Sequence, residues 1–107
     1  MIVRLRQVEG PCADLSPHQL YRVIGIEADE YRILNDHGRP YLYAPELFEV
    51  LDDRRPSDWV REVGDDQEEY AYPPVFNEPG FFEDFFDDQE EAVTTFWRVV
   101  NERLVAA

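Results

Sequence analysis

The first half of the chain alternates apolar and polar residues over short stretches, the period of half-buried β-strands. In residues 2–8, Val3 and Leu5 alternate with arginines, and later stretches repeat this pattern between polar, Gly-containing or Pro-containing turns. A single helical turn with Pro45 at its first position precedes the last stretch. The predicted strands span residues 2–8, 20–27, 31–34, 40–43 and 48–51. Five short strands within about 50 residues indicate a small antiparallel barrel with a core of alternating residues.

A polar segment, residues 52–56, ends the strand pattern inside what we predict to be a single domain. It separates a barrel of residues 1–52 from an acidic C-terminal extension of residues 53–107. Within the extension, residues 58–72 alternate as a hairpin would around a Gly-Asp-Asp turn. The same apolar residues also suit a helical turn, so both interpretations remain open at this segment.

The C-terminal segment has a helical period. Phenylalanines within 81–86 repeat at i, i+1, i+4 and i+5, which predicts a short helix capped by Asn77. A longer helix, about residues 88–104, begins with Asp88 and Glu91 in the spacing of a capping box. Its apolar stripe, which must be buried, consists of Val93, Phe96, Trp97, Val100 and Leu104. The predicted fold class is α+β, mainly β: a five-stranded barrel, a hairpin and an amphipathic C-terminal helix.

Residues 21–52 carry a motif: a strand ending in an acidic turn, then Tyr-x-Ile-x-Asn-Asp-x-Gly-x-Pro-x-x-Tyr and a closing Phe-Glu-Val. The motif positions are Tyr31, Ile33, Asn35, Asp36, Gly38, Pro40, Tyr43 and residues 48–50. This segment, about a third of the chain, resembles a group of small bacterial SH3-like barrel proteins. Some members of the group look like immunity proteins that neutralise a toxin of a rival or sister cell. The resemblance implies an SH3-like barrel and carries over no catalytic residue.

The net charge of the chain limits the kinds of molecule that it can bind. The chain has 24 acidic and 10 basic side chains, a formal charge of −14, and residues 58–107 hold 14 of the acids but 3 arginines. A surface of this sign repels phosphate backbones and anionic membranes, so we expect neither nucleic acid nor a membrane as partner. We expect a basic protein, because opposite charge speeds encounter and sets specificity. The acidic candidate contacts are Glu83, Asp84, Asp87, Asp88, Glu90 and Glu91.

Two tyrosines are further candidate contacts. Tyr41 and Tyr43 alternate on a predicted strand that begins with a proline. Small barrels often present such rings to extended peptides, although ordinary strand positions use tyrosine as well.

Motifs for catalysis or for cofactor binding are missing from the sequence. Cys12 is the only cysteine, which excludes an internal disulfide or a multi-Cys metal site and predicts a small, at least half-buried residue. His18 and His37 fall in predicted loops away from any nucleophile motif. We therefore predict a non-catalytic interaction domain that binds no cofactor or metal.

Two alternatives remain open. One is a metal-binding or enzymatic domain that uses Asp84, Asp87, Asp88 and Glu91. The other is a homo-oligomer in which the apolar C-terminal helix packs against its own copy. A signal-peptide pattern and an apolar run of about 20 residues are both missing, so we expect a cytoplasmic location.

Overall fold

The computed structural model describes residues 1–6 and 14–106, with side chains as far as residue 103. Cys12 and its predicted burial lie outside these residues. The fold is α+β, mainly antiparallel β with a C-terminal helix, which confirms the predicted class at this level. The chain divides into two compact units, Met1–Pro73 and Pro74–Ala107, which we describe separately.

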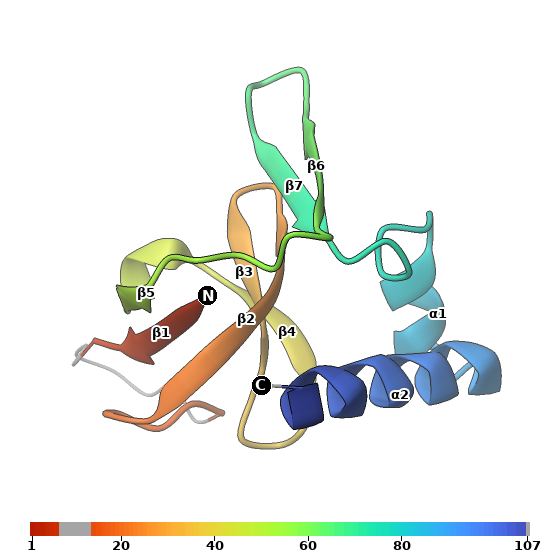
Figure 1. The fold of residues 1–107 in the computed structure, drawn as a ribbon, viewed down its shortest axis with the longest axis horizontal. Helices are drawn as coiled ribbons and strands as arrows, with labels where there is room; N and C mark the ends of the chain where they lie inside the picture. The colour runs from red at the N-terminus through yellow and green to blue at the C-terminus, as the bar shows by residue number, and fades with distance from the viewer. Residues whose placement is uncertain (7–13, 107) are drawn as a thin grey trace. The chain divides into compact units, whose positions relative to one another are not determined.

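Within the described residues, the N-terminal unit contains a seven-stranded sheet (Figure 1), whose first strand ends at Leu5 and is shorter than the predicted strand of residues 2–8. The second and fourth strands have the predicted bounds, and a 3-10 helix, η1 (Pro45–Leu47), forms where Pro45 predicted a helical turn. Residues 58–72 form a hairpin, which settles the choice left open by their sequence. The strands are β1 (Ile2–Leu5), β2 (Leu20–Glu27), β3 (Glu30–Leu34), β4 (Pro40–Tyr43), β5 (Phe48–Asp52), β6 (Val60–Val63) and β7 (Glu69–Tyr72).

Strand β2 is the centre of the sheet, whose order is β4-β3-β2-β1-β5. On one side β2 pairs with β3; on the other, its first half pairs with β1 and Ile26 pairs with Ala71 of β7. A register shift between Val23 and Gly25 marks an irregularity of the β-bulge type, which bends a strand and lets it serve several partners. Among the described residues β4 and β5 do not pair, so the sheet is not closed and a five-stranded barrel is not confirmed.

Alternate strand residues build the core of the N-terminal unit. Val3 and Ile33 are fully buried, and Tyr31 and Trp59 pack against the buried cluster from its border. Burying each aliphatic side chain of this size contributes about 1.5–3 kcal/mol. The buried cluster consists of Val3, Leu5, Leu15, Tyr21, Val23, Ile26, Ile33, Phe48 and Ala71.

The C-terminal unit is organised by aromatic rings between two helices, α1 (Phe81–Phe86) and α2 (Glu90–Ala106). The ring centroids of Phe85 and Phe96 lie 4.7 Å apart, and those of Phe76 and Phe96 lie 5.4 Å apart. Phe96 is 0% exposed and Val100 is buried, as the helical stripe predicted, whereas Val93 and Trp97 are half-buried. The side chain of Leu104, the last member of the predicted stripe, lies outside the described ones.

Both helix starts differ from the predictions. The N-cap residue of α1 is Gly80, with φ 76°, in place of Asn77. Asp88 has φ 57°, and its backbone N–H donates to Phe85 C=O (3.1 Å) while Gln89 N–H donates to Asp84 C=O (3.0 Å). These two bonds form a Schellman motif, so Asp88 ends α1 and does not cap α2. The predicted capping box is therefore wrong, because the end of α1 uses the residue that would have begun α2.

We expect Gly25→Ala to lower the free energy of unfolding by about 2–3 kcal/mol, because overpacking a buried strand forces its neighbours apart. A Cβ at Gly25 would lie 2.1 Å from two ring carbons of Tyr72. Urea denaturation of the full chain measures the change. Gly64→Ala is the matched control, since its Cβ meets only the carboxylate end of Glu68 and should cost less. Equal stability of the Gly25→Ala protein and the natural protein would contradict this packing.

We expect Asp88→Gly to raise the free energy of unfolding by about 0.5–1 kcal/mol, because glycine adopts positive φ without a Cβ penalty. The control is Asp87→Gly, whose φ of −83° needs no glycine and which should lower stability. Urea denaturation again provides the measurement. A gain of the same size in both variants would show that charge removal, and not φ, is responsible.

Candidate partner-binding surface

The six acidic candidates lie together in the C-terminal unit, within what we call the acidic segment, residues 78–91. The segment contains seven acidic residues and no basic residue. All six candidates are exposed. Two lie on α1, two follow its end and two lie in the first turn of α2: Glu83 and Asp84, Asp87 and Asp88, Glu90 and Glu91.

The aromatic core determines the outward direction of these carboxylates. Phe82 and Phe85 of α1 are buried, so Glu83 and Asp84 between them are left on the exposed side of the helix. The Schellman motif then joins α1 directly to the first turn of α2. Part of this acidity stabilises the start of α2, because carboxylates favour the positive end of a helix dipole.

No residue of the acidic segment takes part in the ion pairs found between described residues. Five ion pairs join described residues of the N-terminal unit. Their acidic partners are Glu27, Glu49, Asp52 and Glu69. The N-terminal unit thus uses acids as internal contacts, while the described carboxylates of the acidic segment remain available to a cation from outside.

The two candidate tyrosines belong to β4 and differ from each other. Tyr41 is 43% exposed. Tyr43 is half-buried: its hydroxyl donates to Asp14 (2.5 Å), accepts from Asn35 (3.1 Å), and its ring packs edge-on against Phe48. Tyr43 therefore contributes to the fold, and Tyr41 is the one with an exposed ring.

The described part of the chain contains no group of three or more His, Cys, Asp or Glu side chains that could hold a metal ion. His18 and His37 are both exposed, in turns. None of the described helices is long and apolar enough to cross a bilayer.

A buried arginine was not anticipated from the sequence. Arg32 of β3 is 5% exposed, and its guanidinium donates to Tyr72 Oη (3.0 Å), Pro40 C=O (2.9 Å) and Glu27 Oε1 (3.0 Å). The Tyr72 hydroxyl also donates to Glu27 (3.0 Å), and burial raises the pKa of Tyr72. Strand alternation places Arg32 on the polar face. One residue in the sequence could have indicated this burial. Gly25 pairs with Arg32 across β2 and β3, and it has no side chain to occupy the space on that face of the sheet.

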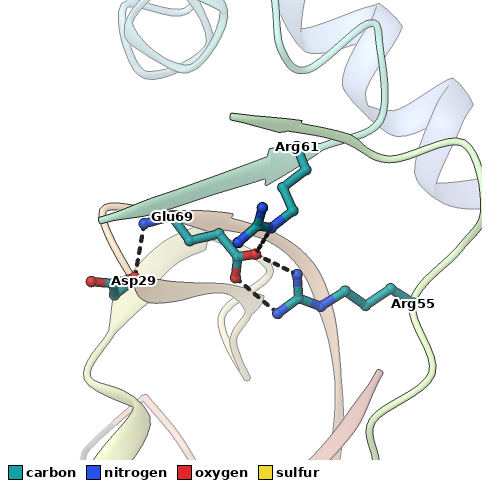
Figure 2. A network of polar contacts seen from close by, with 4 residues as sticks. All are labelled: Asp29, Arg55, Arg61 and Glu69. Atoms are coloured by element: carbon teal, nitrogen blue, oxygen red, sulfur yellow. Dashed lines mark hydrogen bonds and ion pairs between the residues drawn. The ribbon is translucent and has the colours of Figure 1, made fainter. Parts of the chain in front are cut away.

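A second network anchors the β6–β7 hairpin, as Figure 2 shows. The Arg55 guanidinium donates two hydrogen bonds of 2.9 Å to the Glu69 carboxylate, and Arg61 donates a third. The Glu69 backbone N–H donates to Asp29 Oδ1 at 2.8 Å. The Arg55 hydrogen bonds, helped by Arg61, lower the pKa of Glu69 to about 2. We call this the Glu69 clamp; it joins three separate stretches of the N-terminal unit.

Comparison with protein-family models, with curated proteins and with solved structures finds no match to this chain.

We expect the Glu69 clamp to make stability depend on pH. The pKa of Glu69 is lowered from 4.5 in the unfolded chain to about 2, so the clamp's contribution is complete above pH 4.5 and is lost as pH falls toward 2. After allowance for solvent screening, this contribution is about 1–2 kcal/mol. Urea denaturation between pH 6 and pH 3 measures it. In Glu69→Gln, the decrease in stability over this range should be smaller by about 60% of that amount, the part that is lost before pH 3.

The control for the clamp is Glu62→Gln, which removes an exposed carboxylate from the same hairpin. Its stability should fall with pH as steeply as that of the natural protein. If Glu69→Gln and Glu62→Gln have the same pH dependence, the clamp does not hold Glu69 ionised.

Proposed function

We propose that this chain is a non-catalytic, acidic protein-interaction domain whose acidic segment binds a basic protein. The observation that carries the proposal is the exposure of all six candidate carboxylates, together with their absence from the ion pairs of the described residues. We further propose that the partner is a basic toxin and that the chain acts as its immunity protein, in the cytoplasm. The resemblance of residues 21–52 supports this narrower reading.

The uncompensated charge favours a cationic partner on energetic grounds. Carboxylates close together repel one another and lower stability, and in the acidic segment no nearby basic residue within the sequence offsets this. A cationic partner would relieve the repulsion and associate quickly, because the field of the segment attracts it before contact. Salt should weaken such a complex, since exposed charges are screened over about 8 Å at physiological ionic strength.

We propose that the N-terminal unit is an SH3-like barrel that remains partly open. Its strand order, with β1 between β2 and β5, supports this, as does a 3-10 helix between β4 and β5. In this proposal the barrel is the scaffold, and Tyr41 is a secondary contact through its exposed ring.

The test is binding of the full chain to the purified product of the adjacent gene, measured by calorimetry at low salt. We expect the double variant Glu83→Gln/Asp87→Asn to weaken the complex about 10-fold, equivalent to about 1.4 kcal/mol. The difference should shrink at 0.5 M salt, a condition in which the Debye length falls to roughly 4 Å.

The matched control is Glu46→Gln/Asp53→Asn, which removes the same charge from exposed positions of the N-terminal unit. It should weaken binding by less than about two-fold. A control effect as large as that of the first variant would show that net charge, and not the acidic segment, governs binding. Failure to form any complex at low salt would overturn the immunity proposal.

A further inference from the structure

Strand β6 has an open edge. Within the described residues β6 pairs only with β7. Gly64 N–H donates to Glu68 C=O at 2.9 Å, so the hydrogen-bonded pairs of the hairpin continue at Glu62–Tyr70 and Val60–Tyr72. The backbone N–H and C=O groups of Arg61 and Val63 therefore point away from β7, along the edge that no described strand covers.

This edge is exposed and partly apolar. All four residues of β6 are exposed, Val60 by 36% and Val63 by 46%. The two valines lie on opposite faces of the hairpin, since side chains alternate along a strand. Open edges with exposed apolar side chains are where an additional strand pairs most readily.

The hairpin is strongly acidic, which restricts the strand that can pair with it. Residues 58–69 contain six acidic residues and one basic residue, Arg61. The Arg61 guanidinium is bound to Glu69, so it neutralises a charge inside the hairpin. Glu62, Asp65 and Asp66 remain exposed beside or near the open edge. An acidic strand would be repelled here and a basic one attracted.

The hairpin is also held in place before any strand arrives. The Glu69 clamp ties β7 to Asp29 in the β2–β3 turn and to Arg55 before β6 (Figure 2). At the other end of β7, Tyr72 packs against Gly25 of β2 and bonds Arg32 of β3. A preorganised edge loses little conformational entropy on binding, which favours affinity.

We propose that the open edge of β6 docks an extended basic segment of a protein partner, which adds to the sheet as a strand. Its backbone pairs with Arg61 and Val63, its basic side chains lie on the face of Glu62, and its apolar side chains cover Val63 on the opposite face. Strand addition of this kind takes affinity from main-chain hydrogen bonds and specificity from alternate side chains. This edge and the acidic segment consist of different residues, so either proposal can fail without the other.

The experiment titrates the isotope-labelled full chain with a synthetic eight-residue peptide of alternating Arg and Val, and follows amide hydrogen exchange by NMR. We expect the Arg61 and Val63 amides to exchange at least about 10-fold more slowly with peptide present, because each becomes hydrogen-bonded. A peptide with Glu in place of Arg should give no protection.

Val63→Pro should abolish the protection at Arg61, because it removes an outward N–H that the hairpin itself does not use. Val63→Thr is the matched control: it keeps that N–H and should still bind. If Val63→Pro does not fold, Glu62→Lys keeps the backbone intact and should reduce the preference for the Arg-containing peptide, because it removes the acidic side chain on β6 itself.

Four results would overturn the proposal. The Arg-Val peptide could protect no amide of β6, or protect residues 83–91 in place of β6. Both peptides could bind equally well, which would remove the charge argument. Arg61 and Val63 could be protected without peptide in proportion to protein concentration, which would make a second copy of the chain the occupant of the edge.

Discussion

The sheet of this protein depends on one buried cation. Removing a guanidinium from water costs several kcal/mol unless its donors are satisfied, and the acceptors of Arg32 come from three places: Glu27 of β2, Pro40 of β4 and Tyr72 of β7. Strands β2, β3, β4 and β7 must therefore meet in the register that brings these acceptors together. The contact joins residues 40 positions apart in the sequence, Arg32 and Tyr72, and so attaches the β6–β7 hairpin to the sheet.

The rest of the hairpin's geometry follows from this attachment. Tyr72 can reach Arg32 because Gly25 leaves space for its ring, and the Glu69 clamp then holds the other end of β7. With β7 held at both ends, β6 becomes the outer strand, and its backbone groups at Arg61 and Val63 face outward. The interaction that organises the sheet thus also determines which edge stays open.

The two units use acidic side chains in different ways. In the N-terminal unit, carboxylates such as Glu27 and Glu69 satisfy arginines and join strands. In the acidic segment, the six exposed carboxylates satisfy no described cation, while the phenylalanines beside them form the core. The proposed binding function rests on this contrast, because exposed carboxylates that pair with no described cation can attract a cationic partner.

The amino-acid sequence alone determined the strands, the two helices and the phenylalanine core through its periodicity, and the location of the excess charge through its composition. These features can be recognised from residues close together in the sequence. A hydrophobic period of 2 or 3.6 shows which face of a strand or helix is buried, whatever that face packs against. Only the tertiary structure decided that Arg32 is buried, that Tyr43 bonds Asp14 and that Asp88 ends α1. It also decided that residues 58–72 form a hairpin with one open edge. These features depend on which groups meet across long sequence separations or compete for one turn, and local alternation carries no information about either.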